Sequence, residues 1–252
     1  MVVIMFEIKD LNVSVLDKNI LNNFNLKIND GEIHVLMGPN GVGKSTVCKT
    51  ILGDKDYIIN KGTIKYKDKD LTKLDTNERA KLGIYLINQS PMTIEGVTNQ
   101  EMLRIALSSR KDEQIDIFKF NNELVNICKK LDLPTSFIHK NINEGASGGE
   151  RKKVELMHMW VLKPSFIILD ELDSGLDVDA LKIVSKSIND YYKEFRPSSL
   201  IITHHTNVLK YIKPNYVHIL DSGTISLSGD IKLAEDIEKN GFNRANKVSE
   251  TK

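Results

Sequence analysis

The sequence predicts an α/β fold with parallel strands at the centre of a β-sheet, and two observations predict it. The pattern G-x-x-x-x-G-K-[ST] occupies residues 38–45, between a mostly apolar run at 32–37 and a segment at 46–52 that has the composition of a helix. The runs at 166–169 and 199–203 are almost entirely apolar, as in parallel strands that are covered on both faces. A strand, a glycine loop and a helix in this order direct backbone N–H groups toward phosphate.

The composition excludes several classes of protein. The chain has 252 residues, which is enough for one large or two-lobed domain with a substantial core. Its 35 Lys and Arg residues balance 34 Asp and Glu residues, so there is no basic field and we expect no nucleic-acid partner. Cys48 and Cys128 lack the spacing of metal ligands, and we expect both to be small buried residues without a disulfide.

No segment has the roughly 18 consecutive apolar residues that a membrane-spanning helix needs. The apolar start at 1–6 stops at Glu7 and carries no basic residues, so it does not have the pattern of a signal peptide. We therefore expect a soluble, cytoplasmic protein that does not insert into a membrane by itself.

The first third of the chain is rich in predicted strands. Loose alternation of apolar and polar residues predicts an edge strand at 6–15. Residues 76–82 predict a short helix that is capped by Thr76 or Asn77. Further strands are expected at 20–28, 32–37, 63–66 and 84–88.

The middle and last parts of the chain differ in periodicity. Apolar residues recur with helical spacing at 98–109, 115–131 and 147–162, and we interpret residues 90–162 as an α-helical lobe inserted into a sheet domain. The last third predicts further strands and helices, at 166–169, 178–195, 199–203, 207–212, 216–220 and 224–227. The chain 1–252 is then a single domain, whose parts are an α/β lobe at 1–89 and 163–242, the helical lobe at 90–162, and a polar tail at 243–252.

The glycine loop supplies the first candidate site. Lys44 is a mobile cation for the outer phosphates of a nucleotide, the Ser45 hydroxyl can ligate Mg²⁺, and Thr46 can cap the helix or contact the inner phosphate. The alternative is a glycine-rich turn that merely starts a helix, which the full pattern and its flanks disfavour. The candidate nucleotide-binding residues of the loop are Gly38, Pro39, Asn40, Gly41, Val42, Gly43, Lys44, Ser45 and Thr46.

Two acids follow the apolar run at 166–169. The run delivers Asp170 to the carboxyl edge of the sheet, where α/β proteins bind their ligands and where this carboxylate can hold Mg²⁺. Glu171 is then placed to polarise the water that attacks a γ-phosphate. The alternative is that the two acids only cap the next turn.

Residues 147–150 supply a second candidate anion site. Ser147, Gly148, Gly149 and Glu150 precede a predicted helix, and small residues there bring N–H groups together at its N-terminus. One nucleotide needs only one phosphate loop, so a second site suggests two chains that face each other. The alternative is an ordinary Ser-Gly helix cap.

Two more polar residues end predicted strands. His204 follows the run at 199–203 and can hydrogen-bond a γ-phosphate oxygen or the attacking water. Gln89 follows the strand at 84–88, and its amide can ligate Mg²⁺ or the water. Residues 173–177 come directly after Glu171 and can make contacts across a dimer. Taken alone, each of these residues is more often a plain turn residue.

These motifs, in this order, resemble the nucleotide-binding subunits of the ABC superfamily. The resemblance implies a P-loop NTPase fold with a RecA-like mixed sheet core, an antiparallel β subdomain and an inserted α-helical subdomain. It also implies a head-to-tail dimer that binds ATP and Mg²⁺ between one chain's loop and the other chain's residues 147–150. The family's motifs are matched here by Gly38 to Ser45 (Walker A), Gln89 (Q-loop), Ala146 to Glu150 (signature), Asp170 and Glu171 (end of Walker B), Ser174 to Asp177 (D-loop) and His204 (switch histidine).

Within the superfamily, the chain is similar to the SufC family, the ATPases of the SUF system that assembles iron–sulfur clusters. The similarity rests on residues 147–153, 169–181, 201–205 and 211–218. It implies an ATPase that dimerises on ATP and changes the shape of scaffold partners like SufB and SufD. In this family Glu171 is the base, and Gln89 and His204 sense the γ-phosphate.

The chain departs from the family pattern in places. Ala146 and Leu172 differ from the residues expected there, and both changes should affect packing more than chemistry. No aromatic residue is available near 13–20 to stack on adenine, which leaves apolar contact from Val13 or Val15.

Two other functions stay open from the sequence. One is a subunit of a membrane transporter, coupled to membrane helices through residues 90–94. The other is a nucleotide-gated binding module with little turnover.

Overall fold

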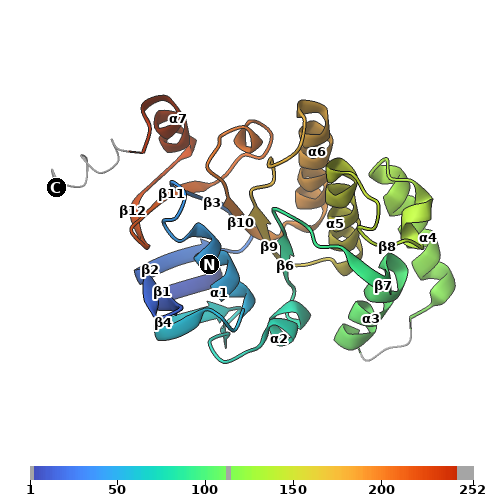
Figure 1. The fold of residues 1–252 in the computed structure, drawn as a ribbon, viewed down its shortest axis with the longest axis horizontal. Helices are drawn as coiled ribbons and strands as arrows, with labels where there is room; N and C mark the ends of the chain where they lie inside the picture. Colours follow the sequence, from blue (N-terminus) through green and yellow to red (C-terminus); the bar gives the residue numbers. More distant parts are fainter. Residues whose placement is uncertain (1–2, 112–114, 243–252) are drawn as a thin grey trace.

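A six-stranded mixed sheet forms the centre of the molecule. The computed structural model describes residues 3–111 and 115–242, so the predicted tail at 243–252 lies outside the described residues. The strand order is β12-β11-β3-β10-β9-β6, in which only β12 is antiparallel to its neighbour. The mixed α/β fold predicted from the sequence is confirmed (Figure 1). The strands are β3 (Ile33–Met37), β6 (Ile84–Ile87), β9 (Phe166–Asp170), β10 (Ser198–Ile202), β11 (Tyr216–Asp221) and β12 (Thr224–Gly229).

A second, antiparallel sheet covers one face of the first, in the order β2-β1-β4-β5. Its strand β1 pairs with both β2 and β4, so the edge position expected for residues 6–15 is wrong. Alternation reports that one face of a strand is buried, and it does not report whether both edges are paired. The strands are β1 (Ile4–Val15), β2 (Lys18–Asn29), β4 (Ile58–Tyr66) and β5 (Lys69–Asp70).

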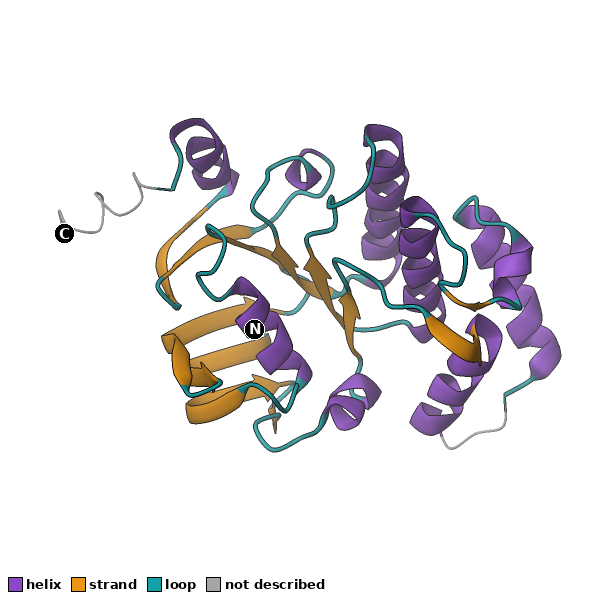
Figure 2. Ribbon diagram, viewed as in Figure 1, coloured by secondary structure: helices purple, strands orange, loops and turns teal. Residues whose placement is uncertain are grey.

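Most of the helices gather beyond β6 and β9 (Figure 2). The chain leaves the sheet at the end of β6 and returns to the adjacent position at β9, with three helices and a two-stranded ribbon in between. The ribbon of β7 (Ile94–Thr98) and β8 (Asn141–Ile142) was not predicted, because its short strands do not alternate. The helices are α1 (Lys44–Leu52), α2 (Thr76–Lys81), α3 (Asn99–Lys111), α4 (Ile117–Lys130), α5 (Gly148–Leu162), α6 (Val178–Phe195) and α7 (Ile231–Asn240).

The structure differs from the predicted helices in three places. Asp75, and neither Thr76 nor Asn77, caps α2, because its extended backbone lets the carboxylate accept the N–H of Glu78 at 2.8 Å. The helix expected at 207–212 is a single 3-10 turn, Val208–Lys210, without a side-chain cap. Helix α7 was not predicted.

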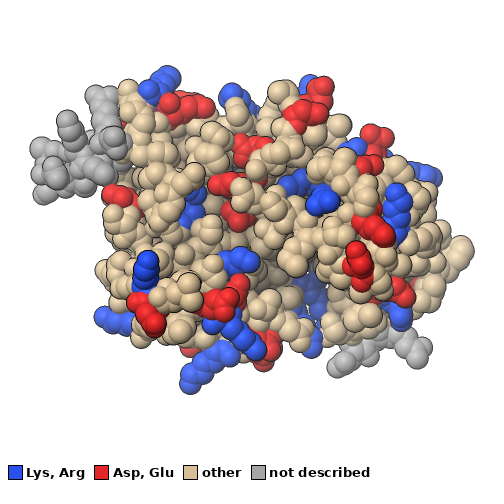
Figure 3. Space-filling model, in the orientation of Figure 1, with Lys and Arg blue, Asp and Glu red and all other residues tan. Residues whose placement is uncertain are grey.

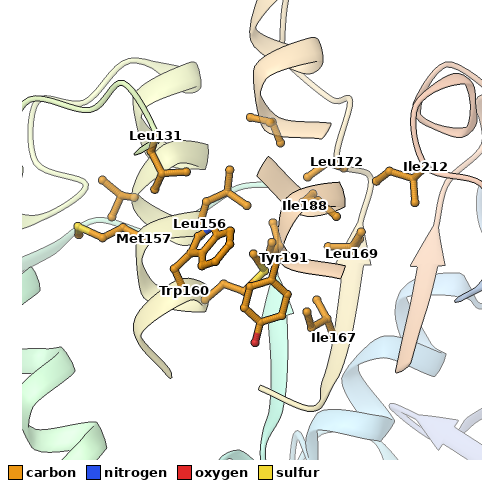
Figure 4. Packing of buried hydrophobic residues seen from close by; sticks show 14 of the residues in the cluster. Leu131, Leu156, Met157, Trp160, Ile167, Leu169, Leu172, Ile188, Tyr191 and Ile212 are labelled. Carbon is orange, nitrogen blue, oxygen red and sulfur yellow. The ribbon is translucent and has the colours of Figure 1, made fainter. Parts of the chain in front are cut away.

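The parallel strands divide the core into two layers. Leu36, Ile168 and Ile202 face the antiparallel sheet and α1, whereas their neighbours on the same strands face the helices α5 and α6. In the second layer the Trp160 and Tyr191 rings meet edge to face with centroids 5.1 Å apart (Figure 4). Cys48 and Cys128 are buried and free, as predicted.

The β11–β12 hairpin contacts the antiparallel sheet at its turn. The N–H of Asn22 in β2 donates to the Gly223 carbonyl at 3.0 Å. A Cβ atom on Gly223 would lie 2.0 Å from the Ile20 carbonyl oxygen, and one on Gly38 would lie 2.5 Å from the Leu220 carbonyl oxygen. The hairpin therefore touches both β2 and the first glycine of the phosphate loop, and neither position has room for a side chain.

The surface shows no segregation of charge on the face in Figure 3, where acidic and basic side chains are interspersed. Among the residues that the structure describes, no helix combines the length and the apolar character needed to cross a membrane.

Candidate functional site

The loop between β3 and α1 presents free N–H groups. Gly43 stands at the N-cap of α1 with φ 110°, and Gly41 has φ 85°, so both adopt backbone conformations that favour glycine. No side chain caps α1, so its first N–H groups and its partial positive charge are available to an anion. Thr46 lies in the first turn rather than at the cap, and the capping role considered for it is wrong.

Lys44 lies at the floor of this loop. Its side chain is buried, and its Nζ donates to the carbonyl oxygens of Gly38 at 2.7 Å and Pro39 at 3.0 Å. Burial lowers the pKa of Lys44, and the charges of Glu171 and Asp170 oppose that shift. The ammonium group is thus held inside the loop, near two carboxylates and beside the uncapped helix.

A cavity of about 420 Å³ opens above the loop. Three of its lining residues come from outside the loop and helix α1: Ile20, Gln89 and Glu171. Ile20, the third residue of β2, was not among the predicted site residues. Val13 is fully buried and cannot contact a base, which corrects one of the two apolar contacts expected for adenine. The loop and helix residues of the lining are Asn40, Gly41, Gly43, Lys44, Ser45 and Thr46.

The Glu171 carboxylate joins the ends of three neighbouring strands. Its Oε2 accepts a hydrogen bond from Gln89 Nε2, two residues after β6, and its Oε1 lies 3.0 Å from His204 Nδ1, two residues after β10. Glu171 itself follows β9 with φ 42°, a strained conformation for a residue with a side chain. Its N–H donates to the Ile202 carbonyl at 2.8 Å, which fixes this turn to β10. The structure therefore brings all three predicted residues into contact.

Asp170 ends β9 and is half-buried. Burial raises its pKa, the adjacent Glu171 raises it further, and Lys152, Lys44 and Lys49 oppose the shift. A cation beside this carboxylate would relieve both effects. The side chains of Ser45, Gln89 and Asp170 carry oxygen atoms of the type that Mg²⁺ prefers as ligands. No group of three His, Cys, Asp or Glu residues that could hold a metal ion occurs in the described part of the chain.

Residues 147–150 lie outside the cavity's lining. Ser147 caps α5 and forms a capping box with Glu150, whose Oε2 accepts from the Ser147 N–H at 2.8 Å and from its hydroxyl at 2.7 Å. These hydrogen bonds lower the pKa of Glu150. The helix-cap alternative thus describes this segment correctly in the single chain. Ser147 and Gly148 are nevertheless exposed, so the N-terminus of α5 is open to a ligand from another molecule.

The segment 173–177 lies between Glu171, which lines the cavity, and the start of α5. The Ser174 N–H donates to the Glu171 carbonyl at 3.0 Å, and Asp177 caps α6 by accepting from the Ala180 N–H at 2.7 Å. A Cβ atom on Gly148 would lie 3.4 Å from the Gly175 carbonyl oxygen, so this segment also contacts the start of α5.

Known proteins identify the family. The family model described as ABC transporter matches residues 21–174. The probable ATP-dependent transporter SufC of Escherichia coli K12 is 43% identical over 94% of this chain and 97% of its own length. The iron–sulfur cluster assembly protein SufC of Plasmodium falciparum is 44% identical over 95% of this chain and 71% of its own length. This chain belongs to the SufC family of ABC ATPases.

As a SufC-family member, the chain binds and hydrolyses ATP. The fold agrees with solved structures at about one fifth identity. A dimeric post-hydrolysis state of the ATP-binding cassette MJ0796, bound to ADP and Pi, superposes with a TM-score of 0.77 over 90% of this chain and 99% of that chain. A nucleotide-free ATP-binding cassette superposes with a TM-score of 0.75 over 94% and 96% of the two chains. The two departures from the family pattern, Ala146 and Leu172, are both buried in the helix-facing core.

Proposed function

We propose that this ATPase serves iron–sulfur cluster assembly, in which two copies close over ATP and change the shape of scaffold partners like SufB and SufD. One observation carries the dimer: the phosphate loop and Glu171 share a cavity, while the exposed N-terminus of α5 lies outside it. The assembly role draws on the likeness to the Plasmodium relative, which is named for it.

The roles of the cavity residues follow from their positions. The loop N–H groups, the start of α1 and Lys44 bind the phosphates, and Ser45, Gln89 and Asp170 hold Mg²⁺. Bound Mg²⁺ neutralises charge on the phosphate oxygens. Glu171 accepts a proton from the attacking water.

Gln89 and His204 keep the Glu171 carboxylate in place until a γ-phosphate arrives. Both contact the same carboxylate, at opposite oxygens, so both can exchange this contact for one to the phosphate or the water. Because His204 and Gln89 belong to different strand ends, the exchange couples the phosphate to two separate loops.

The exposed start of α5 completes the partner's site. In the single chain the Ser147 hydroxyl donates to Glu150, its own helix partner. In the dimer we propose that this hydroxyl and the N–H groups of Gly148 and Gly149 turn to the γ-phosphate of the other chain. The Glu150 carboxylate then loses one hydrogen-bond donor but keeps the Ser147 N–H.

A chain-mixing experiment tests this arrangement. A Lys44→Ala chain and a Ser147→Arg chain should each lack ATPase activity, because every site in either homodimer is broken. A mixture should regain activity, since one site then combines an intact loop with an intact Ser147. A mixture that stays inactive while both chains dimerise would contradict the shared site.

A groove between α2 and α3 is the surface we propose for the scaffold. It has a volume of about 430 Å³ and is lined largely by apolar side chains, among them Ile84, Met102 and Ile105. Ile105 is 60% exposed, and Arg110, which also lines the groove, donates to the Ala80 carbonyl at 2.8 Å. An Ile105→Asp chain should lose the scaffold on purification and keep its basal ATPase activity.

A transporter subunit is the second candidate, because the Escherichia coli relative is named as a probable ATP-dependent transporter. Met92, in the segment predicted to couple to membrane helices, is 72% exposed. Affinity purification from the native cell separates the two candidates: a protein with several membrane spans favours transport, and a β-rich scaffold without spans favours cluster assembly.

A further inference from the structure

A buried ion pair on α5 holds the residue that precedes Gln89. Lys152 is 2% exposed and Glu155 is 8% exposed, and Lys152 Nζ lies 3.5 Å from Glu155 Oε2. Both side chains also bind the backbone of Asn88: the Glu155 Oε1 accepts the Asn88 N–H at 3.0 Å, and the Lys152 ammonium donates to the Asn88 carbonyl. The backbone of Asn88 is therefore held on both sides of its Cα, through its N–H and through its carbonyl.

Such a pair is costly to bury, which argues for more than packing. Burial raises the pKa of Glu155 and lowers the pKa of Lys152, while the attraction between the two charges opposes both shifts. An apolar pair of similar size fills a core at least as well as a buried ion pair. Unlike an apolar pair, this ion pair makes two hydrogen bonds to the backbone of Asn88 and so fixes its position.

A third contact ties the same strand to α5. The Tyr85 hydroxyl, from β6, donates to the Glu155 backbone carbonyl at 3.0 Å. Strand β6 is therefore attached to α5 both within the strand and directly after its end. Gln89, the next residue, reaches the Glu171 carboxylate from this attached point.

We propose that Lys152 and Glu155 are positioning residues for hydrolysis, which set the place of Gln89 through Asn88. Neither contacts the nucleotide cavity. Because Lys152 lies only five residues after Ser147 on the same helix, the pair also connects the exposed start of α5 to Gln89. Closure of a partner on Ser147 then reaches the Glu171 carboxylate through helix α5, the held backbone of Asn88, and Gln89. This inference rests on the proposed role of Gln89.

A double-mutant cycle on kcat tests the clamp in the 252-residue chain. Lys152→Met should lower kcat about 10- to 100-fold, the usual loss when a residue that orients a site residue is removed, with little change in KM for ATP. Combined with Gln89→Ala, it should lower kcat no further than Gln89→Ala does alone, because both changes remove the same contact. Lys152→Arg keeps the charge and the donors and should restore most of kcat.

The matched control is Lys153→Met, on the same helix, where the lysine pairs with the exposed Asp132 at 3.3 Å. It should leave kcat and KM unchanged. If Lys152→Met unfolds, the double substitution Lys152→Met with Glu155→Leu takes its place in the cycle, because it removes both contacts to Asn88 and leaves no buried charge unpaired.

Three outcomes would overturn the inference. The first is a double mutant whose loss equals the product of the two single losses, which would make the pair merely structural. The second is a Lys152→Met chain that behaves like Lys153→Met. The third is a Gln89→Ala chain with full kcat, which would also overturn the role proposed for Gln89.

Discussion

The phosphate loop and the start of α5 are both glycine-rich helix N-termini, yet the chain builds a cavity around only the first of them. At the loop, no side chain caps α1, Lys44 is buried, and the walls of a cavity come from three other parts of the chain. At α5, Ser147 is exposed and its hydroxyl is used by Glu150. An uncapped helix inside a cavity binds a ligand within its own chain, whereas a capped, exposed one needs a partner to displace the cap.

The largest effect should come from Glu171→Gln, which changes the cavity at the phosphate loop and leaves the start of α5 intact. The amide has the same shape and cannot accept the water's proton, so kcat should fall about 10²- to 10⁴-fold. ATP binding and ATP-dependent dimerisation should persist, as measured by nucleotide titration and light scattering. Full activity in this variant would remove Glu171 from its role.

Acid should destabilise the folded chain, since one buried histidine lies on the helix that Ser147 caps and another on the strand beside β3. Burial lowers the pKa of His158, on α5, and of His218, on β11 beside β3, to about 4 in each case. The unfolded chain binds protons at about 6.5, so the free energy of unfolding is highest above that pH and falls as the pH drops to 4. A shift of this size corresponds to on the order of 3 kcal/mol per histidine.

Urea unfolding at a series of pH values measures this loss. His158→Gln should flatten the dependence between pH 6.5 and 4, because the amide does not titrate. An unchanged slope would mean that His158 is protonated in the folded chain.

Gly43→Ala probes how tightly the loop is built. A side chain at φ 110° is strained, and its Cβ would lie 3.0 Å from Leu21 Cδ2. We expect a loss of about 1–2 kcal/mol in unfolding free energy and a roughly tenfold weaker affinity for ATP, since about 1.4 kcal/mol is tenfold. Gly41→Ala is the matched control for the contact, because a Cβ there meets nothing within 4 Å.

The smallest effect on stability should come from Ser147→Ala. This variant should nevertheless separate the start of α5 from the phosphate loop most clearly, because it should change dimerisation and leave ATP binding intact. Loss of the cap should cost about 1 kcal/mol, and ATP affinity of the single chain should not change. Asp75→Ala removes the same kind of capping box from α2 and is the matched control. Only Ser147→Ala should weaken ATP-dependent dimerisation; equal dimerisation in both variants would contradict the shared site.

Much of this could be predicted from the sequence, because the determining signals are local. The glycine pattern at 38–45 specifies the turn before α1, and the apolar run at 166–169 specifies a strand covered on both faces. Contact among Gln89, Glu171 and His204 was predictable in outline, since each residue ends a predicted strand of one sheet. Their roles, and the lobe boundaries at 90 and 162, stay predictions.

Other features depend on contacts between distant segments and leave no local signal. The Lys152 and Glu155 clamp reads in sequence as ordinary charges on a helix, and only the fold shows that both are buried against Asn88. Ile20 was missed for a related reason: a wall of the cavity depends on how β2 lies over the loop, which no stretch of β2 encodes by itself.

The hairpin turn at Gly223 has a consequence for affinity that reaches beyond its own strands. The backbone at Gly223 lies against Ile20, while Leu220 of the same hairpin lies against Gly38, so one hairpin contacts both a wall of the cavity and its base. We therefore expect the β11–β12 hairpin to influence the width of the nucleotide cavity, although none of its residues lines that cavity. Selection for ATP binding should then act on a glycine far from any phosphate.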